Sequence, residues 1–391
     1  MLGVGGLMGI RVATSCVLGA FINFAVLAPI MIQRGDIKSY TAPSGALINI
    51  SRAEIVNQWA LWWGVTMMVV GSLIGLLAKP DLFINAFKSL RRRGPAVARG
   101  DDPLKHIELP LWMSFAGVPV FSVLGAWLTH EFFGIPGLLS FISLPLIFVL
   151  TIICTNSMAL TSWTPTGALA KITQFTMGAI DRSNPANNLI PAGMTAEIAS
   201  NAANLLSDIK PGYMLGAKPR QQAIGHVIGI IAGSVVATPL FYLLFLPPNK
   251  DGVRSVSTLV SEQFAMPAAV QWKGVADLIV KGINSLPSSA IISMAVAAVA
   301  ALVFEVLRLR SKNRFPISAV SVGLGVVLPP EACFAMWIGA LVFWWQARRQ
   351  PAPGSKQHEF WVEGCEPICA GLISGAALVG IGNAIVNVLL S

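Results

Sequence analysis

The stretch Gly137-Leu-Leu-Ser-Phe-Ile-Ser-Leu-Pro-Leu-Ile-Phe-Val-Leu-Thr-Ile-Ile-Cys154 decides the fold class, because it holds no charged side chain over its whole length. A helix crosses the core of a bilayer with about 20 predominantly apolar residues. A surface helix of a soluble protein needs an apolar stripe on one face only. This stretch is apolar all round, so it predicts a helix that lies in a membrane.

Similar apolar runs recur on both sides of this stretch. They cover roughly residues 4–32, 59–78, 110–129, 221–246, 287–307 and 367–390. Only 12% of the 391 residues are charged and 54% are hydrophobic, whereas soluble domains carry about 25% charged residues. We therefore expect an all-α, polytopic membrane helix bundle that forms a single domain over residues 1–391. The runs correspond to about eight full spans plus broken or re-entrant helices.

The positive charge of the chain, formally +9, is concentrated in short segments between the apolar runs. The most basic segment, 79–109, is placed in the cytoplasm by the positive-inside rule, and the polar segment 247–286 is expected to lie outside. Because the aromatic residues sit mainly in the apolar runs, a surface that stacks nucleic-acid bases is not expected. The predicted location is a cell membrane, preferably a bacterial inner membrane, with membrane lipid as a partner.

Proline and glycine interrupt the helical pattern in two places. The first is Trp163-Thr-Pro-Thr-Gly167, where the helix should break. The second is 315–345, which has basic residues at both ends and Pro329-Pro330 in the middle. A re-entrant hairpin that turns at these prolines would return the chain to the basic side, while two short spans or one long span are the alternatives. Irregular backbone at membrane depth is tolerated where it faces protein or a water-filled cavity.

A predicted helix over 191–208 carries a polar stripe. Helical spacing places on one face Glu197, Asn201, Asn204 and Asp208, with Ser200 close by. A membrane helix must turn such a stripe toward a cavity or toward partner groups. The stripe is therefore a candidate wall of a solute pathway, with Glu197 and Asp208 as candidates for proton or ion coupling. An amphipathic helix at the cytoplasmic surface fits the same spacing equally well.

Further candidates lie at the interruptions and in one apolar run. Trp163, Thr164 and Thr166 supply a ring and hydroxyls at the first break, and half-helix ends at the midplane are where many transporters hold substrate. An ordinary interfacial loop is the alternative. Glu331 starts a helix after the two prolines and is either a coupling group or a helix cap. His226 titrates near neutrality if it is accessible, although a packing histidine is commoner.

No pattern of catalytic or metal-binding residues is found in the sequence. There is no GxSxG, HExxH or phosphate-loop motif. The five cysteines are scattered, and no histidine or acidic cluster completes a metal site around them. We predict neither an enzyme nor a bound cofactor or metal. In the absence of a nucleotide site, gradient-driven movement of a small solute is the favoured function.

Several motifs together resemble a known family. The longest is Asp208-Ile-Lys-Pro-Gly-Tyr-Met-Leu-Gly-Ala-Lys-Pro-Arg-Gln-Gln222, and it is accompanied by Gly9-Ile-Arg-Val, by Trp163-Thr-Pro-Thr-Gly with Lys171 to Gln174, by Gly323-Leu-Gly and by Leu328-Pro329. These segments resemble the oligopeptide transporter family, which includes the yellow-stripe-like metal-chelate carriers. The chain resembles the latter two-thirds of the family pattern, and several N-terminal helices of that pattern are missing.

The resemblance implies proton-coupled uptake of small peptides or of metal-chelate-like solutes. It favours the solute pathway over the surface helix as the interpretation of 191–208. The missing helices could be supplied by a second chain. The alternative is a non-transporting membrane scaffold, or the subunit remnant of a split or truncated carrier.

Overall fold

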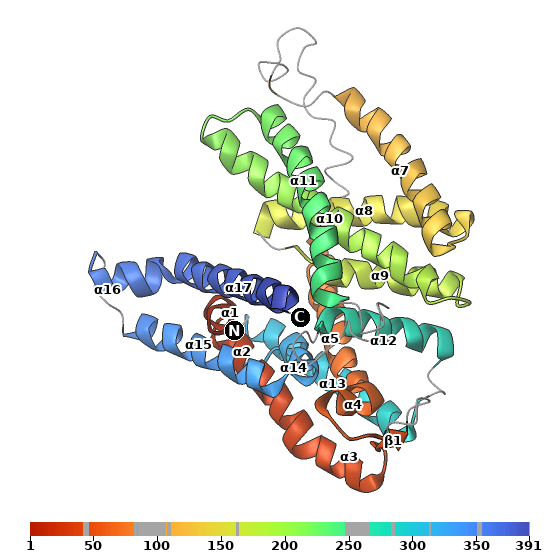
Figure 1. The fold of residues 1–391 in the computed structure, drawn as a ribbon, viewed down its shortest axis with the longest axis vertical. Coiled ribbons are helices and arrows are strands. Elements are labelled where there is room, and N and C mark those ends of the chain that lie inside the picture. The colour runs from red at the N-terminus through yellow and green to blue at the C-terminus, as the bar shows by residue number, and fades with distance from the viewer. Residues whose placement is uncertain are drawn as a thin grey trace. The chain divides into compact units, whose positions relative to one another are not determined.

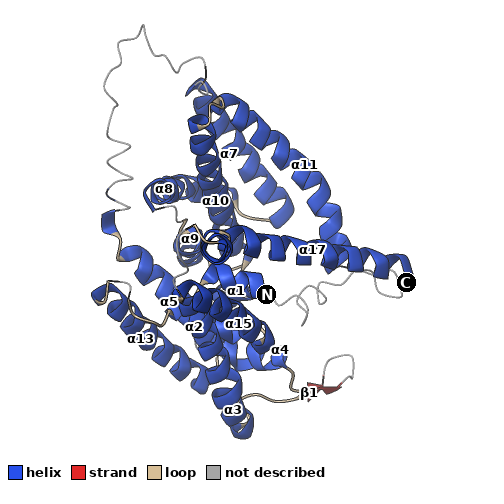
Figure 2. Ribbon diagram, turned by 90° about the vertical axis from the view of Figure 1, so that its left-hand side faces the viewer, coloured by secondary structure: helices blue, strands red, loops and turns tan. Residues whose placement is uncertain are grey.

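The computed structural model describes residues 1–41, 47–81, 84, 107, 111–161, 164–246, 266–282, 286–312, 314–349 and 354–390. Helices form almost all of this part of the chain (Figure 2). The two strands, β1 Tyr40–Thr41 and β2 Leu47–Ile48, pair antiparallel and are two residues long each. The expected all-α architecture is confirmed.

Six helical stretches of the described chain are long and apolar enough to cross a membrane: Ile10–Arg34, Arg52–Leu77, Gly137–Met158, Pro219–Tyr242, Ser288–Arg310 and Cys365–Asn383. Each overlaps an apolar run of the sequence. The prediction of a polytopic membrane bundle with additional broken helices is therefore confirmed, although fewer than the expected eight helices meet this length and hydropathy requirement.

The chain divides into two compact units (Figure 1). The first unit comprises 1–74, 244–274 and 284–391, and the second comprises 75–243 and 275–283. Two compact units can belong to a single transporter domain, so the expected single domain over 1–391 stays a prediction.

The first unit is built from ten helices, the part of α12 Pro267–Lys281 up to Gly274, and three π-helical turns within its described residues. The helices are α1 Leu2–Met8, α2 Ile10–Phe21, α3 Ala28–Arg34, α4 Arg52–Ile55, most of α5 Leu61–Leu77, α13 Ser288–Arg310, α14 Ala319–Val327, α15 Pro330–Arg348, α16 Lys356–His358 and α17 Cys365–Leu390. The π-helical turns are Ile22–Leu27, Val56–Ala60 and Glu359–Glu363.

Two interrupted helices, α1–α2 and α14–α15, pack antiparallel in one register. Four glycines face backbone carbonyl groups of the opposite helix: Gly5 faces Met336, Gly19 faces Val322, Gly325 faces Cys16 and Gly339 faces Leu2. A Cβ atom at any of these positions would overlap a carbonyl oxygen. Small residues permit this close approach of backbones between membrane helices.

The predicted hairpin at Pro329-Pro330 is not formed as two arms packed on each other. In the described residues, α14 packs on α2, while α15 packs on α1 and α2. Leu328 is extended, with φ −71° and ψ 151°, as expected before a proline. The segment 315–345 is therefore a broken helix whose two halves both follow the N-terminal segment.

The first apolar run is also broken, whereas its sequence predicts one continuous span over roughly residues 4–32. Gly9 separates α1 from α2 with φ 79° and ψ 159°, a conformation that glycine adopts without steric cost. In the antiparallel register Gly9 lies opposite Ala332, about one helical turn from the Leu328-Pro329 break. The two interruptions are therefore close to each other along the helix pair.

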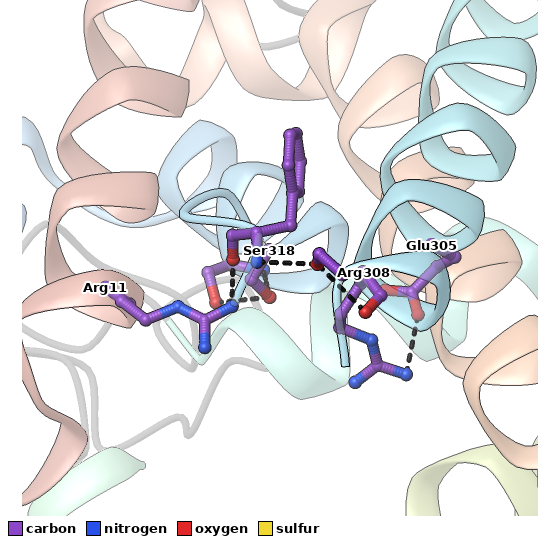
Figure 3. Close-up of polar contacts among 7 residues, drawn as sticks. Arg11, Glu305, Arg308 and Ser318 are labelled. Carbon is purple, nitrogen blue, oxygen red and sulfur yellow. Dashed lines mark hydrogen bonds and ion pairs between the residues drawn. The ribbon is translucent and has the colours of Figure 1, made fainter. Parts of the chain in front are cut away.

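Polar contacts fasten the start of α14 to α2 (Figure 3). The Arg11 guanidinium donates to the Phe315 carbonyl group. The Ser15 hydroxyl donates to the Arg11 carbonyl at 2.7 Å and accepts from the Ser318 backbone N–H at 3.0 Å. An arginine within an apolar run is costly to bury, so these contacts and its exposed position stabilise Arg11 there.

The second unit contains α7 Leu111–Phe133, α8 Gly137–Thr161, α9 Thr166–Ile180, α10 Ala186–Met214 and α11 Pro219–Phe245. Helices α8, α9 and α10 pack on one another (Figures 1 and 2). Ala199 and Ala203 of α10 meet Leu150 and Cys154 of α8 and Leu169 of α9 in a buried apolar cluster. The small α10 side chains allow the three helices to approach closely.

Two predicted boundaries change. Helix α10 extends beyond the predicted range 191–208, because Pro191 and Pro211 lie inside the helix instead of ending it. Helix α12, Pro267–Lys281, occupies part of the predicted external loop 247–286 and has buried residues. The rest of that loop, and nearly all of the predicted cytoplasmic loop 79–109, lie outside the described residues, so their sides of the membrane stay predictions.

Candidate functional site

The helical break of the second unit lies between α8 and α9. Helix α8 ends at Thr161 and α9 begins at Thr166, so the break falls where the Thr-Pro-Thr-Gly sequence predicts it. Thr164 and Thr166 are half-buried and Pro165 is buried. Trp163, the predicted ring of this site, lies outside the described residues.

Six polar side chains are buried between α9 and α10, and this is the strongest concentration of buried polar groups in the described residues. They are Lys171, Thr173 and Gln174 of α9 and Asn187, Asn188 and Thr195 of α10, each exposed by 3% or less. Burial of a polar group is costly unless it is hydrogen-bonded. A membrane protein that keeps six of them in one place has a functional or a specific packing reason for doing so.

Hydrogen bonds link these side chains in two sets. The Lys171 ammonium donates to Gln174 Oε1 at 2.9 Å, and Gln174 Nε2 donates to Asn188 Oδ1 at 3.2 Å. The Thr173 and Thr195 hydroxyls lie 2.8 Å apart. We call Lys171, Gln174 and Asn188 the lysine–amide chain.

The predicted site residues do not include the lysine–amide chain. Lys171 to Gln174 belongs to the segments that resemble the family, and Asn188 precedes the predicted polar helix. One signal was present in the sequence. A lysine inside an otherwise apolar helix is a functional-site hypothesis by default, and Gln174 follows Lys171 by one turn on the same face.

The predicted stripe lies on another face of α10. Glu197, Asn204 and Asp208 are exposed on the unit, while Asn201 and Ser200 are half-buried. The amide of Asn201 donates to Glu197 Oε1 at 2.8 Å, so two stripe residues interact. The buried side of the same helix is formed by small residues such as Ala199 and Ala203. Helix α10 therefore has polar groups both in its packed interface and on its outer face.

Two predicted coupling residues come together at the turn between α10 and α11. His226 Nδ1 lies 3.9 Å from Asp208 Oδ2, and the Gln222 amide donates to the Asp208 carbonyl at 3.4 Å. All three residues belong to, or directly follow, the long motif over 208–222. Glu331, the remaining coupling candidate, lies in the first unit, exposed in the first turn of α15.

Two large cavities in the described residues are apolar. One, of about 740 Å³, is lined in the second unit by Phe121, Phe141, Phe148, Met194 and Ile198, among others. The other, of about 460 Å³, lies in the first unit beside Trp59 and Trp63, whose indole N–H groups already donate to Ser289 and Asn23. A solute with many polar groups would lose hydrogen bonds in either cavity. The buried polar groups between α9 and α10 are therefore the better candidate for recognising such a solute.

Metal ligands do not cluster in the described part of the chain: it contains no group of three or more His, Cys, Asp or Glu side chains that could hold an ion.

Comparison with known proteins places this helical arrangement in a family context. The family model described as "OPT oligopeptide transporter protein" matches residues 1–387. A Saccharomyces cerevisiae protein named as an oligopeptide transporter is 25% identical over 89% of the chain and 53% of its own length. Proteins named as metal-nicotianamine transporters are similar as well. One from Oryza sativa is 28% identical over 55% of the chain and 30% of its own length. One from Arabidopsis thaliana is 25% identical over 68% and 36%. The chain thus spans about half, or less, of the length of these relatives.

Proposed function

This chain belongs to the oligopeptide transporter family, and from that premise we propose that it acts in secondary active transport, with proton-coupled uptake of small peptides or metal-chelate-like solutes. The family and the apolar helices make it a multi-pass membrane protein of a transporter family and not an enzyme. The solute, the driving ion and the membrane in which it works are the proposed parts.

The observation that supports this proposal most strongly is the distribution of polar groups on α10. One face of this helix is packed against α8 and α9 through apolar and buried polar side chains, and another face presents Glu197, Asn204 and Asp208. Polar groups of a membrane helix face a partner or a water-filled space. We therefore place one wall of the solute pathway on the outer face of α10, beside the helical break at 162–165.

We propose the class of solute from the names of the relatives. Their names describe transporters of oligopeptides and of metal–nicotianamine complexes. Both kinds of solute are small, polar and rich in carboxylate and amine groups. Such solutes suit a pathway lined by amide, hydroxyl and carboxylate side chains, which can replace the hydrogen bonds that the solute makes with water.

Proton coupling is assigned to the contact between Asp208 and His226. A proton on His226 makes the contact an ion pair between α10 and α11, and loss of that proton leaves a carboxylate beside a neutral ring. The relative position of the two helix ends can thereby respond to the proton. Glu197 on the same stripe is the second coupling candidate.

Uptake by the full chain in proteoliposomes tests the proposal. A proton gradient should drive accumulation of trialanine or of Ni²⁺–nicotianamine, and collapse of the gradient by a protonophore should abolish it. His226→Gln and Asp208→Asn should uncouple uptake from the gradient, while Lys273→Met, a change of an exposed lysine on α12, should leave it intact. Accumulation that continues after the gradient collapses would refute proton coupling.

Cysteine labelling tests the pathway separately. Glu197→Cys, Asn201→Cys and Asn204→Cys should react with a membrane-impermeant thiol reagent, and the solute should slow the reaction. Ala199→Cys and Ala203→Cys, on the packed face, are the matched controls. Equal labelling of both sets would argue against a one-sided pathway.

A second candidate is a membrane subunit that does not transport by itself. The relatives whose names describe transport are roughly twice as long as this chain. Under this alternative, the chain alone shows no uptake, and uptake appears when a chain carrying the remaining family segment is reconstituted with it.

A further inference from the structure

We propose that the lysine–amide chain between α9 and α10 is a binding site for a carboxylate group of the transported solute. The side-chain amide of Asn188 would donate to one of its oxygens, and the positive charge of Lys171, which is linked to Asn188 through Gln174, would attract it. This inference rests on the proposed transport function and names the chemical group by which the solute is recognised.

The orientation of the amides follows from the lysine. An ammonium group can only donate hydrogen bonds, so the atom of Gln174 that faces Lys171 must be its oxygen, as the 2.9 Å contact shows. The Gln174 nitrogen then points to Asn188, which must in turn present its oxygen. The nitrogen of Asn188 is left on the far side. Side-chain amides are easily assigned the wrong way round from their shape alone, but here the lysine excludes the reversed arrangement.

This orientation makes the site a donor of hydrogen bonds. Both side-chain carbonyl oxygens of the chain, Gln174 Oε1 and Asn188 Oδ1, already accept a bond. Asn188 Nδ2 is fully buried, and no acceptor for it is found among the described residues. A buried donor without an acceptor costs about 1–3 kcal/mol. A ligand that supplies an acceptor removes this penalty, and a ligand with negative charge also offsets the buried lysine.

A carboxylate meets both requirements. It accepts hydrogen bonds on two oxygens and cannot donate when ionised, and its negative charge is attracted by a nearby ammonium group. Small peptides carry a carboxylate at the C-terminus, and amino-acid-based metal chelators carry several. The two solute classes of the proposed function therefore share the group that this site would bind.

The site is closed in this structure. Lys171, Gln174 and Asn188 are exposed by 2% or less, so a solute can enter only if α9 and α10 separate locally. Pro191 provides a point at which α10 can yield. A proline inside a helix removes the backbone hydrogen bond to the residue four positions earlier, here Asn187, which neighbours Asn188. Asn187 also has a buried Oδ1 for which the described residues offer no hydrogen-bond donor.

The test measures binding to the purified full chain by thermal stabilisation. The probes are two matched pairs: trialanine with its C-terminal amide, and the carboxylate chelate Ni²⁺–nitrilotriacetate with the amine chelate Ni²⁺–triethylenetetramine. We expect stabilisation by the carboxylate member of at least one pair and by neither carboxylate-free member. Stabilisation by trialanine assigns the site to peptides, and stabilisation by the nitrilotriacetate complex assigns it to chelates.

Three variants connect the binding to the site. Lys171→Met should weaken carboxylate binding about 10-fold, because it removes the positive charge that attracts the carboxylate, and Lys171→Arg, which keeps the charge, should restore most of it. Asn188→Asp places a carboxylate within the site itself, so it should abolish probe binding and raise the melting temperature of the ligand-free protein. Lys273→Met, an exposed lysine of α12, is the control and should bind as the wild type does.

The outcomes separate this site from the transport proposal. Equal binding of the amidated peptide, unchanged affinity in both Lys171→Met and Asn188→Asp, or no stabilisation by either carboxylate probe would overturn the site. If Lys171→Met does not fold, the site is tested by comparing the probe affinity of Asn188→Asp with that of the wild type. Carboxylate binding that depends on Lys171, without uptake into proteoliposomes, would confirm the site and refute transport by this chain.

Discussion

Replacement of Gly325 by alanine tests the helix pair that organises the first unit. Gly325 faces the backbone carbonyl of Cys16. A Cβ atom at this position would lie less than 3.0 Å from that oxygen, a distance that real Cβ atoms essentially never show. The obstacle is main chain and cannot rotate away. Helices α2 and α14 would have to separate until the contact reached about 3.4 Å. Because four glycines share one register, the neighbouring contacts would loosen as well.

The magnitude follows from two opposing terms. Overpacking of a tight interface costs about 1–3 kcal/mol, while alanine is favoured over glycine inside a helix by about 0.8–1 kcal/mol. The net change for Gly325→Ala is a destabilisation of up to about 2 kcal/mol. Gly371→Ala on α17 is the matched control, because nothing lies within 4 Å of a Cβ atom built there. That control should be neutral or slightly stabilised.

Thermal unfolding of both variants in detergent, followed by size-exclusion chromatography, gives the comparison. Gly325→Ala should melt at a lower temperature than the wild type, and Gly371→Ala should not. Cys16→Ala should fail to rescue Gly325→Ala, because the obstructing atom belongs to the backbone. Equal melting temperatures for the two glycine variants, or rescue by Cys16→Ala, would refute the antiparallel register.

Three further predictions concern buried polar groups and can be checked by thermal or denaturant unfolding. Thr173→Val should lower the free energy of unfolding by about 1 kcal/mol, because it leaves the Thr195 hydroxyl without its 2.8 Å partner. The double variant Thr173→Val/Thr195→Val should recover part of this stability, and additive losses would contradict a direct contact. Glu305→Gln should destabilise the first unit by about 1–3 kcal/mol, because it breaks the 2.7 Å ion pair between a buried carboxylate and Arg308. This cost is lower than for a fully buried ion pair because the arginine is partly exposed, and Glu305→Ala should cost at least as much. Hydrogen bonds from the Ser183 backbone N–H and hydroxyl and from Asn187 lower the pKa of the half-buried Asp181 carboxyl below its usual 3.8. Its contribution to stability is therefore present above pH 3.8 and is lost as the pH falls further through the lowered value; Asp181→Asn should lack that component of acid destabilisation in melts recorded from pH 5 downward.

A shared feature of both units is helical interruption beside close backbone packing. In the first unit, Gly9 and Leu328-Pro329 break two facing helices within about one turn of each other. In the second, the break between α8 and α9 precedes the helix that carries Lys171. Interrupted helices leave backbone groups unpaired within the helix, and at membrane depth such groups must face protein or a cavity. The interruptions are therefore the places in each unit where a polar solute could find hydrogen-bond partners.

The sequence by itself determined which segments are membrane helices. Runs such as 137–154 are apolar over a length that only a bilayer-spanning helix requires. Pro165 together with Gly167 predicts the break between α8 and α9, although Pro191 and Pro211 do not break α10. The stripe of Glu197, Asn201, Asn204 and Asp208 also follows from spacing alone, because 3.6 residues per turn fix the angle between side chains. What lies opposite that stripe does not follow from spacing.

Tertiary structure decided which polar groups are buried together and where the helices break without a proline. Gly9 lies in an apolar run, and glycine is compatible with both helical and positive φ values, so only packing against α15 and α14 distinguishes a break from a continuous helix. Lys171, Gln174 and Asn188 meet because α10 lies against α9. Local periodicity contains no information on which helix covers which face, since that depends on contacts between segments distant in sequence.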